Sequence, residues 1–140
     1  MAKQVRDLMN QKPIKVPRSS SLIDAARKMR EAGVGAIVVE DDGKICGLIT
    51  DRDIAIRAVA QGRDPNTTRV VDICSTELTT LSPNDDLDRA IDMMRKKAIR
   101  RVPVVDASNQ AVGILSLGDL AMERDPRSVL GQISAAPPNQ

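Results

Sequence analysis

Two short stretches of the chain carry a hydroxyl residue followed three positions later by an aspartate. In "GLITDRD" (residues 47–53) the pair is Thr50 and Asp53, and in "GILSLGD" (113–119) it is Ser116 and Asp119. A hydroxyl and an acid at this spacing form a capping box at a helix start. A carboxylate in such a place also accepts hydrogen bonds from both hydroxyls of a ribose. The pattern therefore indicates either two helix caps or two ligand sites.

Composition excludes most other chemistries. The chain has no histidine and two cysteines, Cys46 and Cys74, so a Ser–His or Cys–His pair cannot be built and no metal site is expected. Without Phe, Tyr or Trp no ring can stack on a base, and a net charge of +2 is too small to hold nucleic acid. No P-loop motif is present. We expect a protein that is not an enzyme, with two buried and inert thiols; a redox-linked disulfide is the alternative for them.

The chain also lacks the sequence features of a membrane or secreted protein. No apolar run approaches the roughly 20 residues that span a bilayer, and "MAKQVRDLMNQK" is not a secretory signal. Apolar residues make up 41% of the 140 residues, which is enough for a core built from aliphatic side chains. A cytoplasmic protein is expected.

The two motifs belong to a duplicated unit of about 60 residues. A shift of 65 residues places Val5 on Val70 and Met29 on Met94, and one inserted residue then brings Gly47 onto Gly113. Internal repeats of this kind indicate stacked or paired copies of one unit. We predict repeat 1 over residues 3–61, a connector over 62–69, repeat 2 over 70–124 and a tail over 125–140 that is disordered at its end.

Each repeat has the pattern β-α-β-β-α. In repeat 1, helix 21–32 begins at Ser21 and ends at Gly33, and strands 36–40 and 44–50 lead to helix 51–62. In repeat 2, a helix with a stripe of apolar residues precedes strands 102–106 and 111–116 and helix 117–124. Short extended pieces at 14–16 and 80–81 precede the first helices. The predicted class is α/β (α+β), two repeats packed with pseudo-twofold symmetry.

These features resemble a tandem pair of CBS domains, the cystathionine-β-synthase-type regulatory module. The resemblance rests on "GLITDRDI" and on "IRRVPVVD" with "VGILSLGDLA", and it covers roughly residues 3–124. Stand-alone bacterial CBS-pair proteins of the hypoxic response protein group are similar in "TDRDI" and "DPNT". The resemblance implies two clefts between the repeats that bind adenosine-containing ligands, namely AMP, ADP, ATP, S-adenosylmethionine or NAD-type molecules.

The resemblance also implies which residues hold such a ligand. Thr50 and Asp53 would hold one ribose, and Ser116 and Asp119 the other. The residues expected to enclose the bases are Val34, Gly35 and Ala36 in repeat 1, Ile99, Arg100, Arg101 and Pro103 in repeat 2, and, as weaker candidates on the short first strands, Lys15 and Thr80. Repeat 1 departs from the pattern because Val38 stands where repeat 2 has Pro103.

For two basic features the sequence allows either a contact with the ligand or a solvated position on the surface. Arg52 at a helix start either reaches a phosphate or is a solvated surface residue, and Gly118 at the matching position predicts unequal sites. The stretch "RKKAIRR" (95–101) is a solvated helix end, a phosphate contact through Arg100 or Arg101, or a nucleic-acid patch.

Our leading hypothesis is a regulatory module that binds an adenine nucleotide, AMP foremost, needs no other cofactor and forms a homodimer. Helices 54–60 and 117–122 are the expected interface, and the effector protein is unknown. The second hypothesis is a structural dimerisation module without a bound nucleotide. An enzyme and a nucleic-acid binder follow; turnover of nucleotides would revive the third hypothesis, and retention on heparin the fourth.

Overall fold

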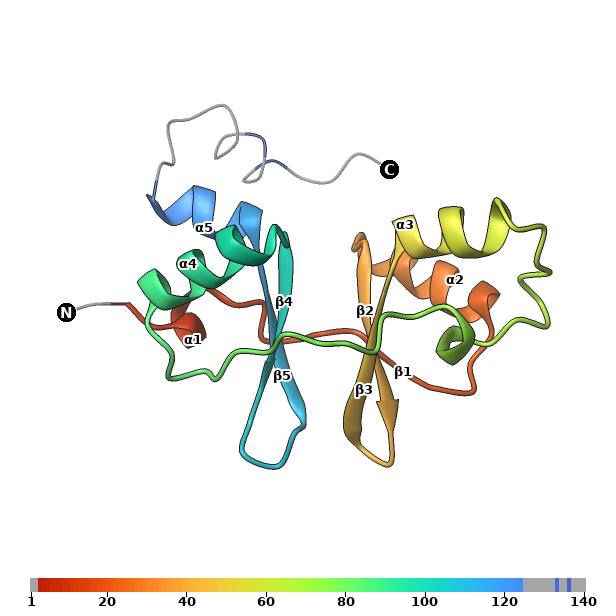
Figure 1. The fold of residues 1–140 in the computed structure, drawn as a ribbon, viewed down its shortest axis with the longest axis horizontal. Helices are drawn as coiled ribbons and strands as arrows, with labels where there is room; N and C mark the ends of the chain where they lie inside the picture. Colours follow the sequence, from red (N-terminus) through yellow and green to blue (C-terminus); the bar gives the residue numbers. More distant parts are fainter. Residues whose placement is uncertain (1–2, 125–132, 134–135, 137–140) are drawn as a thin grey trace. The chain divides into compact units, whose positions relative to one another are not determined.

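The computed structural model describes residues 3–124 and the single residues Ile133 and Ala136, so the predicted tail otherwise lies outside the described part. The described chain forms two compact units, one made of residues 13–78 and one made of residues 3–12 together with 79–124 (Figure 1). Each unit has its own sheet and its own core, and each is described by itself. None of the helices in the described residues is long and apolar enough to cross a membrane.

The unit of residues 13–78 is built around a three-stranded sheet. Its strands are β1 (Lys15–Pro17), β2 (Ala36–Asp41) and β3 (Lys44–Thr50); β1 pairs in parallel with β2, and β2 pairs antiparallel with β3. Its helical elements are α2 (Leu22–Ala32), α3 (Asp51–Asp53), the π-helical turn η1 (Ile54–Val59) and the 3₁₀ turn η2 (Val70–Asp72). The predicted helix 51–62 is present but ends at Val59, and its second part is π-helical: the amide of Ala60 bonds to the carbonyl of Ala55, five residues back, which makes a wider turn.

The second unit has a two-stranded sheet. Strands β4 (Arg101–Val105) and β5 (Ala111–Ser116) pair antiparallel and are accompanied by α1 (Val5–Leu8), α4 (Leu87–Lys97) and α5 (Leu117–Arg124). The predicted first strand at 80–81 is reduced to one parallel bridge between Leu81 and Val104. The ladder stops there because the amide of Ser82 donates to Asp85 Oδ2 and Pro83 has no amide hydrogen.

The first helix of each repeat ends in the left-handed conformation, as Gly33 predicted for repeat 1. Ser21 Oγ accepts the amide of Asp24 at 3.2 Å at the start of α2, and Gly33 has φ 66° at its end. In repeat 2 the corresponding residue is Ala98, with φ 53°. A left-handed conformation costs a residue with a Cβ roughly 1–2 kcal/mol, so the same helix end is strained only in repeat 2.

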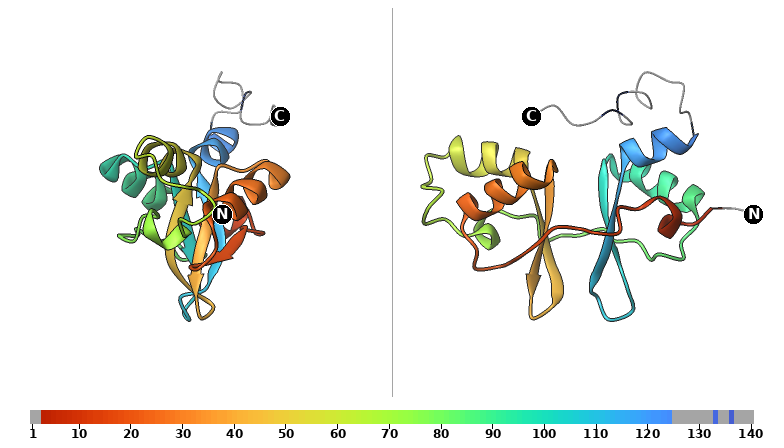
Figure 2. Two further views of the ribbon diagram at one scale, coloured as in Figure 1. Left: turned by 90° about the vertical axis from the view of Figure 1, so that its right-hand side faces the viewer. Right: turned by 180° about the vertical axis from the view of Figure 1, so that it is seen from behind.

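The two sequence repeats exchange their first segments, so that each segment packs in the unit that holds the other repeat. Val5 is fully buried in the core of the unit that holds repeat 2, with its amide 2.9 Å from the carbonyl of Asp85. Its counterpart Val70 is fully buried in the core of the other unit, with its amide 2.8 Å from the carbonyl of Ser20. Figure 2 shows α1 beside α4 and α5 in the view from behind. Packing therefore does not follow the sequence duplication, whose boundaries at 3–61 and 70–124 stay a prediction about the repeats.

Candidate functional site

The first hydroxyl–carboxylate pair lies where β3 passes into α3. Thr50 ends the strand and caps the helix, and Asp53 ends the first helical turn. The amide of Thr50 donates to Asp53 Oδ2 at 2.9 Å, and the amide of Asp53 donates to Thr50 Oγ1 at 3.1 Å. We call Thr50 and Asp53 the first corner. The helix-cap interpretation is confirmed here, since both bonds of a capping box are present.

The second pair repeats this geometry where β5 passes into α5. The amide of Ser116 donates to Asp119 Oδ2 at 2.9 Å, and the amide of Asp119 donates to Ser116 Oγ at 3.1 Å. We call Ser116 and Asp119 the second corner. Within the described residues the other carboxylate oxygen, Asp119 Oδ1, has no hydrogen-bond or ion-pair partner, so it is available to a donor from outside the chain.

The strand register brings several predicted site residues to each corner. Ala36 is paired with Thr50, and the carbonyl of Gly35 accepts the amide of Asp51 at 3.0 Å. At the second corner Arg101 is paired with Ser116, and the carbonyl of Arg100 accepts the amide of Leu117 at 2.8 Å. Two small residues thus flank the first corner and two exposed arginines flank the second, which gives the two corners different charge.

Other predicted residues lie one or two positions away from the corners. Val34 and Ile99 are half-buried and precede the paired strands, each with its amide bonded to the end of the preceding helix, at Met29 and Met94. Pro103 is buried opposite Ile114, two residues along β4 from Arg101 and so on the same face of the strand. Arg52 is exposed in α3.

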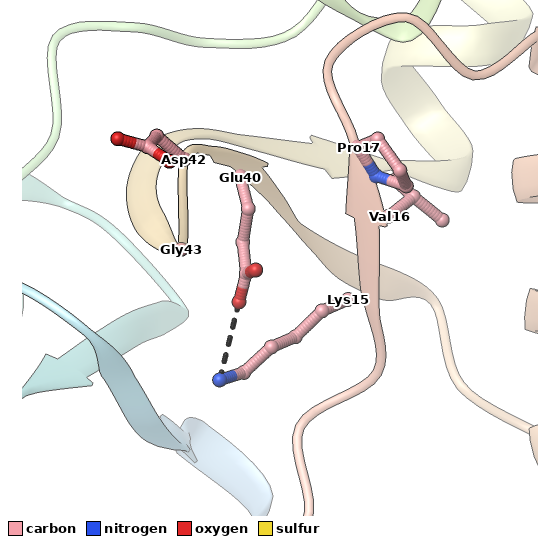
Figure 3. Close-up of a pocket in the computed structure, with 6 residues that line it drawn as sticks. All are labelled: Lys15, Val16, Pro17, Glu40, Asp42 and Gly43. Carbon is pink, nitrogen blue, oxygen red and sulfur yellow. Dashed lines mark ion pairs between the residues drawn. The ribbon is translucent and has the colours of Figure 1, made fainter.

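Lys15 and Thr80 line pockets whose walls contain no corner residue. A cavity of about 230 Å³ is bounded by β1, the end of β2 and Gly43 of the hairpin turn, and Figure 3 shows the Lys15 ammonium turned toward Glu40. The two groups form an ion pair at 3.2 Å without a directed hydrogen bond. The matching cavity in the second unit measures about 520 Å³ and includes Arg6, Thr80 and Asp106. The assignment of Lys15 and Thr80 to a base stays a prediction.

The glycines that begin both motifs are required by a crossing segment. A Cβ on Gly47 would lie 2.6 Å from Cys74 Sγ and 3.0 Å from the carbonyl oxygen of Ser75. A Cβ on Gly113 would lie 2.5 Å from Met9 Sδ and 2.9 Å from the carbonyl oxygen of Asn10. We call residues 73–75 and residues 8–10 the crossing segments; the first is bridged to Leu48 and the second to Ile114. Only glycine admits a backbone this close.

Sequence reasoning missed one residue at the first corner. Arg57 Nε lies 3.7 Å from Asp53 Oδ1, and Arg57 Nη1 donates to the carbonyl of Ile73 at 3.0 Å. The spacing of four residues between Asp53 and Arg57 is the ordinary signal of an ion pair on a helix and could have identified the contact with Asp53. The contact with Ile73 depends on the crossing segment, which no local pattern reveals.

The two thiols lie in the unit of residues 13–78. Both cysteines are free; Cys46 is half-buried at the β-bulge between β2 and β3, and Cys74 is buried. Burial raises the pKa of both thiols, and nearby Asp41 raises that of Cys46 further. A raised pKa leaves little thiolate at neutral pH and disfavours a nucleophilic role. Among the described residues no three His, Cys, Asp or Glu side chains are grouped as metal ligands.

Comparison with known proteins yields a consistent group of matches. A CBS domain model matches the chain twice, over residues 5–59 and 70–125. The CBS domain-containing protein YhcV of Bacillus subtilis is 43% identical over 120 residues, which are 86% of this chain and 84% of that protein.

Two solved structures resemble the chain over most of its length. The CBS domain pair of protein MJ0100, in complex with 5′-methylthioadenosine and S-adenosyl-L-methionine, has a TM-score of 0.81 at 27% identity and covers 91% of this chain and 100% of that chain. Hypoxic response protein I with two coordinated zinc ions has a TM-score of 0.75 at 33% identity and covers 86% of this chain and 98% of that chain.

Proposed function

The chain belongs to the CBS domain family, as the resemblance predicted, and from that premise we propose that it is a regulatory module that binds an adenosine-containing ligand at its corners and catalyses no reaction. The observation that carries the proposal is the second corner, where a half-buried aspartate keeps one oxygen without a partner among the described residues. The similar MJ0100 domain pair, solved with two adenosine-containing molecules, supports the ligand class.

The corner geometry supports a ribose as the group that is held. Asp119 Oδ2 already accepts the amide of Ser116, so Asp119 Oδ1 is the atom that would accept a ribose hydroxyl. A charged acceptor strengthens such a hydrogen bond. Arg100 and Arg101 at the same corner favour a ligand that also carries phosphate, for which AMP is the first candidate, with ADP, ATP and NAD-type molecules behind it. A cytoplasmic location remains part of the proposal.

The test is thermal unfolding of the purified protein, followed by calorimetry or an external dye, with AMP, ATP, S-adenosylmethionine and NAD. A specific ligand at 100 times its dissociation constant stabilises by about 2.7 kcal/mol, which is several degrees for a chain of this size. The shift should shrink in Asp119→Ala, which leaves the first corner intact, and persist in full in Asp24→Ala, a matched control in the first turn of α2. No shift with any of the four would defeat the proposal.

The absence of catalysis is supported by the chemistry of the described side chains. Both thiols are protonated at neutral pH because burial raises their pKa, and the sequence contains no histidine that could act as a base. Incubation with ATP and with NAD should therefore give no new product by chromatography, and turnover at a rate proportional to protein concentration would contradict this part of the proposal.

A second function, a dimerisation module, is favoured by three exposed apolar side chains. Ile56 and Val59 on η1 are 45% and 67% exposed, and Leu117 at the start of α5 is 42% exposed. Isolated large apolar residues are common on surfaces, but Ile56 and Val59 both lie on the short element η1, where they expose two apolar side chains close together in the sequence. We propose a second copy of this chain as the occupant. Light scattering of the wild-type protein should give the mass of a dimer, and that of Val59→Lys the mass of a monomer. Wild-type protein that is still a monomer at 100 times the concentration used in this measurement would exclude the dimer.

A further inference from the structure

In the unit of residues 13–78, the guanidinium of Arg57 contacts both the first corner and the crossing segment 73–75. Arg57 Nε lies 3.7 Å from Asp53 Oδ1 of the first corner. Arg57 Nη1 donates to the carbonyl of Ile73 at 3.0 Å and reaches Ser75 Oγ at 3.5 Å. Both of these acceptors belong to the crossing segment. The planar fork of an arginine suits such a double contact, because its nitrogens hold fixed directions.

The crossing segment 73–75 both pairs with β3 and keeps Cys74 buried. The amide of Leu48 and the amide of Ser75 each donate to the other residue's carbonyl at 3.0 Å, so the segment adds a short pairing to β3. Between the two Arg57 acceptors lies Cys74, whose buried Sγ rests over Gly47. Any loosening of the segment therefore exposes a thiol that is otherwise covered.

The second unit has no equivalent connection among its described residues. Four residues after Asp119 the chain has Glu123 instead of an arginine. Glu123 Oε1 pairs with Lys3 Nζ at 2.7 Å, and Lys3 lies outside the crossing segment 8–10. The second corner thus has a free carboxylate oxygen, whereas at the first corner Arg57 already occupies the matching oxygen.

We infer that Arg57 is a positioning residue that links ligand occupancy of the first corner to the crossing segment 73–75; the inference rests on the proposed function. A ribose hydroxyl that donates to Asp53 Oδ1 competes with Arg57 for that oxygen. Arg57 without its carboxylate partner is less well held, and so is the hydrogen bond that it makes to Ile73. Ligand at the first corner is therefore reported as a change in the crossing segment, and ligand at the second corner is not.

The experiment measures how fast Cys74 reacts with Ellman's reagent at pH 8. Cys46→Ser serves as the background, so that Cys74 is the thiol that reacts, and Arg57→Gln and Glu123→Gln are added to it separately. Adenosine is the probe because it carries the ribose without a phosphate. Without adenosine, Arg57→Gln should raise the rate about fivefold, since reaction needs local opening and one charge-assisted hydrogen bond has been removed. Glu123→Gln should leave the rate unchanged.

Adenosine separates a linking role from a merely structural one. It should raise the Cys74 rate in the background protein and in Glu123→Gln, and leave the rate of Arg57→Gln where it was. Arg57→Lys should retain part of the response, because an ammonium can pair with Asp53 but cannot hold both contacts. A rate without adenosine that Arg57→Gln leaves unchanged would overturn the inference. An unchanged Cys74 rate would overturn it too, if adenosine raises the melting temperature of a background protein that also carries Asp119→Ala and so binds at the first corner.

Failure of the proposed function gives a different result. If adenosine, AMP and S-adenosylmethionine all leave the melting temperature unchanged, ligand binding is refuted and the inferred link is refuted with it. The comparison of Arg57→Gln with the background protein in the absence of adenosine still decides whether Arg57 holds the segment.

Discussion

The two repeats build the same corner and surround it differently. Both corners form the two bonds of a capping box, at 2.9 and 3.1 Å in each case. The first carboxylate is paired with Arg57 and flanked by Gly35 and Ala36, whereas the second is flanked by Arg100 and Arg101. The duplication therefore preserved the backbone geometry, while the side chains around it came to differ. One fold thus carries two corners of different charge and different availability.

We expect the largest loss of stability from substitutions in the exchanged segments. Val5→Ala and Val70→Ala each remove buried methyl groups from a core, and each should cost about 2–3 kcal/mol in the free energy of unfolding. Native-state hydrogen exchange should place the lost protection in β4 and β5 for Val5→Ala and in β2 and β3 for Val70→Ala. Loss of protection in the unit of the same sequence repeat would contradict the exchange.

We expect the next largest loss of stability where a glycine of β3 or β5 contacts a crossing segment. Gly47→Ala should destabilise by about 1–2 kcal/mol, because the added Cβ meets the buried Cys74 Sγ and the backbone of Ser75. Gly113→Ala should cost less, since the thioether of Met9 is flexible and can partly move away. Urea unfolding of both variants measures the difference. Equal costs would mean that the backbone contacts, which are similar in the two repeats, decide the energy.

The left-handed residue after α2 is a glycine and the one after α4 is an alanine, and substitution can interchange the two residue types. Ala98→Gly should stabilise by about 0.5 kcal/mol, because glycine takes φ 53° without the strain of a Cβ. Gly33→Ala should destabilise by about 1 kcal/mol at the same position of repeat 1. Thermal unfolding of the two variants tests the pair, and a destabilised Ala98→Gly would show that the Ala98 methyl group contributes packing.

The smallest expected effect is the pH-dependent contribution of the Asp72 carboxylate to the stability of the fold. The amide of Arg69 donates to Asp72 and holds the pKa of this exposed carboxyl below its usual value. A carboxyl with a lowered pKa stabilises the fold at pH values above its unfolded pKa, and this stabilisation is lost as the pH falls through the folded pKa. The melting temperature of Asp72→Asn should therefore lie slightly below that of wild type at pH 7 and converge with it in strong acid. A gap that widens in acid would refute the assignment.

Local patterns determined much of the structure. The hydroxyl–acid spacing predicted both helix starts, and the strands 44–50 and 111–116 and the helix 117–124 were predicted at the residues where they lie. Ser21 and Gly33 marked the ends of α2 because capping and the left-handed turn involve neighbouring residues. Alignment of the chain with itself revealed the duplication and, with it, the family.

Contacts between residues distant in sequence were decided by the tertiary structure alone. The exchange of Val5 and Val70 between cores, the approach of Cys74 to Gly47 and the contact of Arg57 with Ile73 join residues 16 or more positions apart. No period of 2 or 3.6 residues encodes which segment covers a given strand, because that choice depends on how two cores are filled together. The sequence thus determined the elements and the corners, and the packing of the crossing segments determined which corner is tied to the rest of its unit.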